Sequence, residues 1–323
     1  MAYVLNSTAA GEQYGFERAI ANFAIKAVHE SVGLVNTTTV VTPTQGNVFE
    51  IPLFAPLAYQ DYNPNGSGGN VSGDASEQTP PLGQSSITAT PAVAATAFDI
   101  FYNATTSFNL AATLGSELGE AFGEKVDQRV AAAFLGFKAT AGNTMYDVSA
   151  DGFARVKELG ALGLVDAGTS VSDASADANT VLGLIRLVKM QWKKARLPGS
   201  PVVVLDSDSQ FRLLGELTGG AVTNNVSDMG NELLTTGSIQ NIYGVSVTFS
   251  TFLQTATRTV NGQSVTATVG AYFGDQAVYT VMKQGLDIKM GEKPGGLQMW
   301  LTGVAYNGAG VGDLRRGGAI NVA

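Results

Sequence analysis

The stretch FNLAATLGSELGEAFGEKVDQRVAAAFLGF, residues 108–137, carries the strongest helical pattern in the chain. A large apolar side chain recurs there at every fourth position, namely at Leu110, Leu114, Leu118, Phe122, Val126, Val130 and Phe134. Four residues advance an α-helix by about 400°, so the apolar stripe drifts around the axis by roughly 40° at each step. The pattern predicts a helix of about 28 residues, roughly 40 Å long, that contacts different neighbours at its two ends.

An extended region precedes this helix. Residues 38–57 are dense in Thr and Val and contain prolines that bar a helix, and residues 87–102 regain the same extended character. Between them, residues 63–86 hold five glycines and three prolines and offer little apolar surface to bury. We therefore expect a long hairpin with a mobile tip that projects from the body, a kind of loop that is usually functional.

Further helices and strands are predicted on both sides. Residues 12–34 predict a helix whose apolar stripe is formed by Phe16, Ile20, Phe23 and Ala27. Residues 177–196 predict another, whose inner face is formed by Val181, Leu184, Ile185, Val188 and Trp192. Strands are expected at 201–205, 245–249, 269–282, 285–290 and 297–306. Because they mix with helices without regular βαβ alternation, the sequence predicts an α+β fold.

Three local signals concern turns and helix ends. Ser207 follows the strand 201–205 and, with Gln210, predicts a capped start for a short helix at 211–217. Asn261-Gly262 lies between two Thr/Val runs and predicts a two-residue hairpin turn. Glycines recur at 308, 310 and 312 without the spacing of a phosphate-binding loop, so we interpret them as a turn.

Composition excludes several classes of protein. The 323 residues exceed what one hydrophobic core usually supports, so we expect two lobes or an extended subunit. There is no cysteine, which excludes disulfide scaffolds, thiolate nucleophiles and cysteine-based zinc sites. The first residues lack the pattern of a secretory signal, and no apolar run is long enough for a membrane span. We expect synthesis in a reducing cytoplasm and no membrane partner.

The net charge of −8 is unevenly spread. No lysine or arginine occurs between Lys26 and Lys125, whereas this segment holds nine acidic residues, namely Glu30, Glu50, Asp61, Asp74, Glu77, Asp99, Glu117, Glu120 and Glu124. Such a segment repels phosphates, which argues against a conventional nucleic-acid-binding protein. It would instead attract a basic patch on another copy of the chain.

Few residues are suited to catalysis. His29 is the only histidine, and a place at the end of the first helix explains it better than a catalytic role does. Asp206 and Asp208 follow a buried strand, where a pair of carboxylates can hold a divalent metal in nucleotide-sugar glycosyltransferases. The alternative is that they cap the next helix, and no nucleotide-binding half precedes them. We expect no metal and no cofactor.

A cluster of cations lies on the second predicted helix, at Arg186, Lys189, Lys193, Lys194 and Arg196. The cluster is compatible with a nucleic-acid patch, although a solvated face whose charges favour the helix C-terminus explains it more simply. A third interpretation is that this face meets the acidic hairpin of a neighbouring subunit.

Several segments, taken in order, resemble the major capsid proteins of tailed bacteriophages, particularly the podovirus-like type with the Hong Kong 97-type capsid fold. They are GSELGEAF at 115–122, VDQRV at 126–130, LPGSPVVVL at 197–205 followed by Phe211 and Leu213-Leu214, GSI at 237–239 and IYGVSV at 242–247. The resemblance covers nearly the whole chain. It rests on the combination and order of these segments.

The resemblance implies a non-enzymatic L-shaped subunit. Its parts would be an N-terminal arm at 1–39, an extended loop and peripheral strands at 40–107, a spine helix and peripheral domain at 108–175, an axial domain at 176–290, and returning peripheral strands at 291–323. Such subunits self-assemble into hexamers and pentamers of an icosahedral head that encloses double-stranded DNA. The implied partners are other copies of the chain, portal and scaffolding proteins, a cement protein and packaged DNA bound without sequence specificity.

Some relatives crosslink their subunits through a lysine of the extended loop, but the corresponding loop of this chain has none. We therefore expect a non-covalent shell. The residues expected at subunit contacts are Phe16, Ile20, Phe23, Tyr59, Asp61, Tyr62, Asp74, Glu77, Arg186, Lys189, Arg315 and Arg316. Two alternatives remain open: an encapsulin-like nanocompartment shell, and a metal-dependent glycosyltransferase that uses Asp206 and Asp208.

Overall fold

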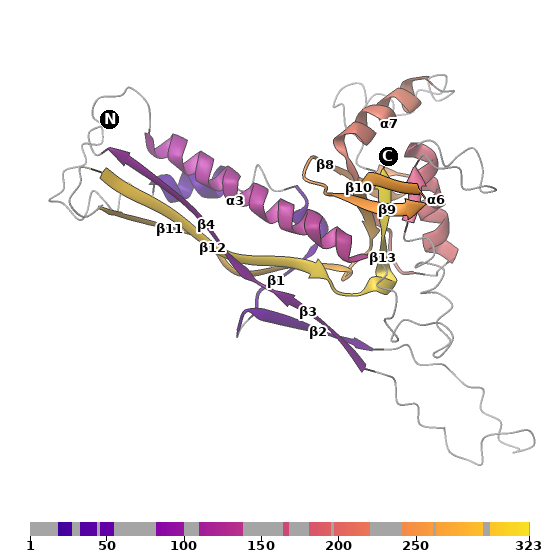
Figure 1. Ribbon diagram of the computed structural model, residues 1–323, viewed down its shortest axis with the longest axis horizontal. Helices are drawn as coiled ribbons and strands as arrows, with labels where there is room; N and C mark the ends of the chain where they lie inside the picture. The colour runs from indigo at the N-terminus through magenta and orange to yellow at the C-terminus, as the bar shows by residue number, and fades with distance from the viewer. Residues whose placement is uncertain are drawn as a thin grey trace, which may run out of the picture.

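The computed structural model shows two sheets, a long helix and a projecting hairpin (Figure 1). It describes residues 19–27, 33–43, 46–54, 82–99, 110–137, 164–167, 181–194, 197–219, 241–260, 263–292 and 298–322. None of the helices among them is long and apolar enough to span a membrane.

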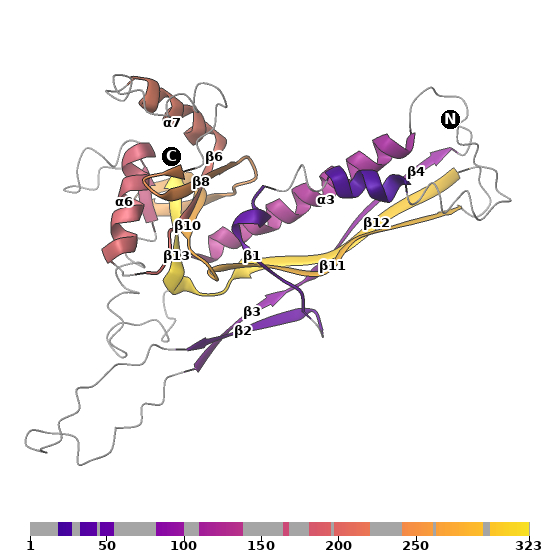
Figure 2. The same cartoon turned by 180° about the vertical axis from the view of Figure 1, so that it is seen from behind.

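A four-stranded sheet forms the elongated part of the molecule. Its order is β1-β11-β12-β4, with β1 (Thr39–Val41) parallel to β11 (Val278–Glu292). The strands β12 (Gln298–Val311) and β4 (Thr90–Asp99) continue the sheet in antiparallel pairs. Helix α3 (Leu110–Phe134), followed by the short 3₁₀ turn η2 (Leu135–Phe137), lies along one face of this sheet (Figures 1 and 2). The expected spine helix is therefore confirmed.

The drift of the apolar stripe on α3 is also confirmed. At the N-terminal end, Leu118 packs with Ile20, Met290, Met299 and Leu301. Towards the C-terminal end, the stripe joins a different cluster, whose members include Phe122, Val126, Val130, Phe134, Val269, Phe273 and Val278. Because the stripe turns as it advances, one helix contacts the long sheet at one end and the second sheet at the other.

The second sheet has seven strands in the order β5-β13-β10-β6-β8-β7, with β9 also paired to β10. The strands are β5 (Leu164–Ala167), β6 (Val202–Asp206), β7 (Asn241–Ile242), β8 (Val245–Ser250), β9 (Thr255–Val260), β10 (Gln263–Phe273) and β13 (Gly317–Val322). One face packs against α6 (Val181–Lys194) and α7 (Ser207–Gly219). The predicted inner face of α6 is confirmed, because its five apolar residues are all buried. The pairing of β9 with β10 across residues 261–262 confirms the predicted hairpin.

The projecting hairpin is formed by β2 (Val48–Phe54) and β3 (Leu82–Thr88), paired antiparallel. The expected hairpin is thus confirmed, but residues 82–86, which we assigned to its mobile tip, belong to β3. The other residues of the expected tip, 63–81, lie outside the described residues. After Ala89 the chain enters β4 and joins the long sheet. The extended run predicted at 87–102 therefore contributes to both the hairpin and the long sheet.

The glycines at 308 and 310 lie in β12 and not in a turn, which corrects our interpretation. A Cβ at Gly310 would lie 2.8 Å from Ile87, and one at Gly308 would overlap the carbonyl of Thr88. These positions lack side chains because β3 crosses closely over β12.

Three further expectations differ from the structure. The predicted strand 269–282 is two strands, β10 and β11, separated at 274–277, and the predicted strand 285–290 is the continuation of β11. The helix α7 is capped by Asp206 and not by Ser207, since the Asp206 carboxylate accepts the Ser209 amide at 3.1 Å. In the sheets, β11 lies in the long sheet and β13 in the seven-stranded one.

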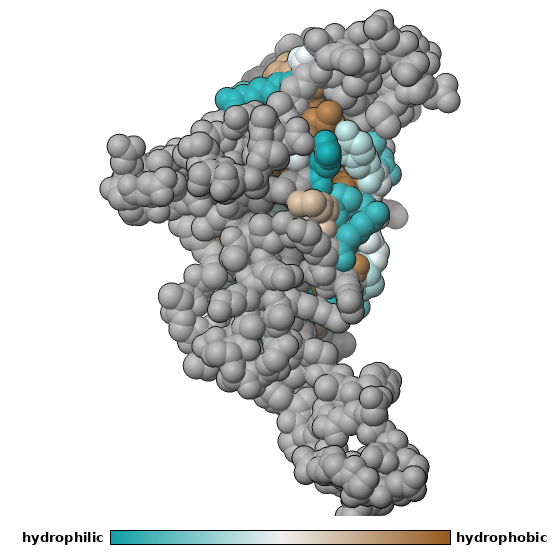
Figure 3. All heavy atoms as spheres, turned by 90° about the vertical axis from the view of Figure 1, so that its right-hand side faces the viewer, coloured by the Kyte–Doolittle hydropathy of each residue, from teal (hydrophilic) through white to brown (hydrophobic). Residues whose placement is uncertain are grey.

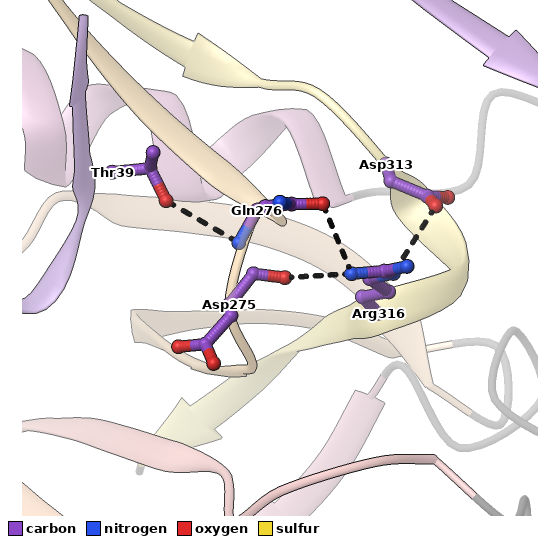
Figure 4. A network of polar contacts seen from close by, with 5 residues as sticks. All are labelled: Thr39, Asp275, Gln276, Asp313 and Arg316. Atoms are coloured by element: carbon purple, nitrogen blue, oxygen red, sulfur yellow. Dashed lines mark hydrogen bonds and ion pairs between the residues drawn. The ribbon is translucent and has the colours of Figure 1, made fainter.

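The chain crosses between the two sheets twice at one junction, through residues 274–277 and 312–316 (Figure 4). Two backbone hydrogen bonds join these crossings, from Gly274 to Arg316 at 2.9 Å and from Gly312 to Ala277 at 2.8 Å. The Arg316 guanidinium donates to the Asp275 carbonyl at 3.2 Å and lies 3.6 Å from the Asp313 carboxylate. One arginine thus ties together both connections between the sheets.

Candidate assembly surfaces

The N-terminal helix (residues 19–27) packs directly on α3, where α3 has two glycines one turn apart. A Cβ at Gly115 would lie 2.7 Å from the Ile20 carbonyl oxygen, and one at Gly119 would overlap the carbonyl of Ala24. The two backbones therefore approach more closely than side chains would permit. This contact buries Ile20 completely and leaves Phe23 38% exposed on the outer side.

A buried carboxylate anchors the segment that follows this helix. Asp127 of α3 is 3% exposed, and its carboxylate accepts the backbone amides of Gly33 at 3.0 Å and Leu34 at 3.2 Å. Hydrogen bonds to a charged acceptor are stronger than neutral ones, and this one spans 93 residues of sequence. The N-terminal segment is thereby held along the spine helix.

Arg129, also on α3, holds the start of β4 against β12. Its guanidinium donates to the carbonyls of Thr90 at 3.0 Å, Pro91 at 3.3 Å and Asn307 at 2.7 Å, and also to the Asn307 side-chain oxygen. All these acceptors are neutral, so desolvation lowers the pKa of Arg129. The planar fork of an arginine suits a corner where several carbonyls converge.

The hairpin has its own small core where it leaves the sheet. Ile51, Leu53 and Ile87 are buried there with Ala89 and Val281. Ser85 donates from its hydroxyl to the Val311 carbonyl at 2.9 Å, and Lys283 donates to the Asn47 side-chain oxygen at 2.5 Å. The base of the hairpin is therefore fixed to the body by packing and by polar contacts.

Large apolar side chains are exposed on several separate surfaces. Those on the elongated part include Ile25, Val40, Val48, Val93 and Trp300, and those on the seven-stranded part are Met190, Phe211 and Tyr243. Val93 is 63% exposed and Phe211 is 72% exposed. Single exposed apolar residues are ordinary, but their spread over the hairpin, sheet and helices fits a subunit with several modest contact surfaces.

The expected contact residues fall into three groups. Phe23 and Arg186 are exposed, whereas Ile20 is buried inside the subunit. Lys189 donates to the Gly244 carbonyl at 3.1 Å and to the Ser200 hydroxyl at 3.3 Å, and Arg316 holds the junction between the sheets. The others lie outside the described residues, namely Phe16, Tyr59, Asp61, Tyr62, Asp74 and Glu77, and the side chain of Arg315 is likewise not described.

Sequence reasoning missed Asp127 and Arg129, which fix the N-terminal segment and the start of β4. A signal for Asp127 was available, since it stands beside Val126 and close to the apolar stripe of the spine helix. Arg129 likewise stands beside Val130 of the stripe, but no local pattern identifies its acceptors, which are backbone carbonyls far away in the sequence.

Of the two residues weighed for metal chemistry, Asp206 has a structural role, and Asp208 lies exposed in the first turn of α7. Asp206 accepts from both the amide and the hydroxyl of Ser209 at the start of α7. No group of three possible metal ligands occurs among the residues that the structure describes. His29 lies outside them.

Burial raises the pKa of the Tyr279 hydroxyl, an effect that Arg316 opposes and Asp313 reinforces.

Comparison of the sequence with protein-family models and with curated proteins finds no match. Among solved structures, the capsid of the cyanophage P-SCSP1u matches with a TM-score of 0.61 and 18% identity, over 89% of this chain and 86% of that chain. The capsid of Ralstonia phage GP4 matches with a TM-score of 0.61 and 16% identity, over 91% and 89%. A virus-like particle from Pyrococcus furiosus matches with a TM-score of 0.53 and 8% identity, over 94% and 98%. The chain therefore has the α+β capsid fold of tailed phages, as the sequence resemblance predicted.

Proposed function

We propose that this chain is the major capsid protein of a tailed bacteriophage, which self-assembles into the hexamers and pentamers of an icosahedral head. The observation that supports this function is the fold, shared with phage capsids over 89% and 91% of the chain. Within the head, the shell would enclose double-stranded DNA without reading its sequence. The role is structural, so no catalytic residue, metal or cofactor is assigned.

The architecture suits this role in physical terms. An elongated subunit with a hairpin fixed at its base, and with exposed apolar side chains on distinct surfaces, can contact several neighbours at once. Each contact is modest, but repetition over a closed shell makes the whole assembly stable.

The division into functional parts is also proposed. Residues 1–39 would act as an arm, 40–107 as the extended loop, 108–175 as the peripheral domain with its spine helix, and 176–290 as the axial domain around the capsomer centre. Because β11 belongs to the long sheet and β13 to the seven-stranded one, β11 would serve the peripheral domain and β13 the axial domain. The contact residues proposed above are retained, with Ile20 acting through the packing of the N-terminal helix.

An encapsulin-like shell is the second candidate, since a virus-like particle from Pyrococcus furiosus shares the fold at a TM-score of 0.53. The phage capsids match at higher TM-scores and identities. The glycosyltransferase alternative has no support, because Asp206 is engaged in capping a helix. The capsid role implies portal, scaffolding and cement proteins as partners. It also implies synthesis in the host cytoplasm and a final place in the virion.

Expression of the chain, followed by gradient sedimentation and negative-stain microscopy, tests this function. A capsid protein yields closed particles, with or without a scaffolding partner. Nuclease-protected DNA in particles from infected cells supports a phage head, whereas a packaged enzyme supports the encapsulin-like alternative. A denaturing gel of intact particles should show only the 33.4 kDa chain, and a ladder of larger species would contradict the proposed non-covalent shell.

A further inference from the structure

Helix α6 presents a basic face opposite its buried one. Arg186, Lys189 and Lys193 are spaced at i, i+3 and i+7, which places them on one side of an α-helix. Arg186 and Lys193 are exposed, and Met190 between them is 43% exposed. Figure 3 faces the end of the molecule where α6 lies, and its coloured strip mixes hydrophilic with hydrophobic side chains. The sheet supports α6 from behind, so this face points away from the subunit's core.

Helix α3 presents an acidic face with the same spacing. Glu117, Glu120 and Glu124 also stand at i, i+3 and i+7, and all three are exposed, opposite the buried residues Leu118 and Val126. Lys125 is exposed next to Glu124, so the face carries three negative charges and one positive. Within the described part of the chain, none of the three glutamates forms an ion pair.

The two faces match each other in charge and in length. Each spans eight residues, roughly 10 Å along its helix. They are not joined within one subunit: Figures 1 and 2 place α6 on the outer side of the seven-stranded sheet, while α3 runs along the four-stranded one. A subunit thus carries two complementary helix faces that it does not pair with each other.

We infer that the basic face of α6 docks on the acidic face of α3 of a second copy of this chain. The inference rests on the proposed function, which supplies neighbouring copies at fixed geometry. A second copy is favoured over nucleic acid because the same chain offers an acidic partner of equal spacing and because its net charge is −8. Each exposed ion pair contributes little, but complementary faces select the correct partner and orientation, and the contact repeats around the shell.

Reversing the charges of each face by mutation tests this contact. The variant Arg186→Glu/Lys193→Glu reverses two of the charges on α6 and keeps Lys189, which donates to Gly244 and Ser200. The variant Glu117→Lys/Glu124→Lys changes α3. We expect each variant alone to lower particle yield at least about tenfold, and the two together in one chain to restore it, as measured by gradient sedimentation and microscopy. Circular dichroism checks that every variant is folded.

Arg212→Glu/Lys289→Glu is the matched control, because it makes the same change in net charge at two exposed positions outside both helix faces. It should assemble like the unmodified chain. If the α6 reversal does not fold, Arg186→Gln/Lys193→Gln replaces it, and its particle yield should depend less on salt than that of the unmodified chain.

The outcomes separate the two proposals. If the unmodified chain forms particles but the single reversals assemble normally, or the combined variant is not restored, the α6–α3 contact is wrong while the capsid function stands. If the unmodified chain forms no particles under any condition, with or without scaffolding protein, both proposals fail.

Discussion

The carboxylate of Asp127 on the spine helix accepts the backbone amide of Leu34, with both oxygens 3.2 Å from that nitrogen. This contact joins the N-terminal segment to the longest helix among the described residues, across a part of the chain that includes both strands of the hairpin. Helix α3 is therefore the element to which the N-terminal segment, the long sheet and the seven-stranded sheet are all attached.

Replacement of this carboxylate should weaken the fold. Asp127→Asn keeps one acceptor but loses the charge, and Asp127→Ala leaves the amides of Gly33 and Leu34 without their acceptor. We expect a loss of about 1.5–3 kcal/mol in the free energy of unfolding for Asp127→Ala and a smaller loss for Asp127→Asn. Urea denaturation of the unassembled subunit measures it. Asp287→Asn, at a side chain that is 44% exposed, is the control, and equal effects at the two positions would contradict the role of Asp127.

Gly119→Ala should displace the N-terminal helix. The added methyl group would overlap the Ala24 carbonyl and lie 2.8 Å from the Ala27 side chain, so two packed backbones must separate. We expect a loss of about 1–3 kcal/mol, although alanine is the better helix former, together with faster proteolysis of the N-terminal segment. Gly215→Ala in α7 is the matched control, since open space surrounds that position and the same change should stabilise the chain slightly.

Arg129→Lys tests whether geometry or charge holds the start of β4. A lysine keeps the charge but cannot reach the carbonyls of Thr90 and Asn307 together in one plane. We expect a loss of about 1–2 kcal/mol in stability to urea. Lys125→Arg, an exposed change on the same helix, should have no effect. Unchanged stability of Arg129→Lys would show that the charge alone is sufficient.

Tyr272 should make the subunit sensitive to alkali. Its buried hydroxyl has no hydrogen-bond partner, and burial raises its pKa well above the ordinary value. Both states keep the proton below the unfolded pKa of about 10, and above it the unfolded chain loses the proton first, so stability falls as pH rises. Tyr272→Phe should therefore lose less stability between about pH 9 and pH 11, and should be no less stable at neutral pH. If the unmodified chain and Tyr272→Phe lost the same stability over this pH range, Tyr272 would not be the source of the alkaline sensitivity.

The sequence predicted the elements whose pattern is local. The four-residue recurrence from Leu110 to Phe134 predicted the spine helix and also that its two ends contact different neighbours, because the drift of a helical stripe depends only on helix geometry. The inner face of α6 and the hairpin turn at Asn261-Gly262 were likewise predicted, since both depend on short-range spacing.

Features that depend on close contact between segments distant in the sequence could not be predicted in this way. Gly308 and Gly310 suggested a turn, but their role is to let another strand cross closely over β12, which no local pattern reveals. The bonds of Asp127 and Arg129 join residues far apart in the sequence. Asp206 resembled a metal ligand because capping and metal binding use the same carboxylate chemistry.

Cryo-electron microscopy of particles formed by the purified chain tests whether the chain is a capsid subunit. We expect closed icosahedral shells whose subunits each show a single long rod of density for α3, residues 110–134, lying on a sheet with a projecting hairpin. A folded chain that stays a 33.4 kDa monomer under all assembly conditions, including the presence of scaffolding protein, would contradict it.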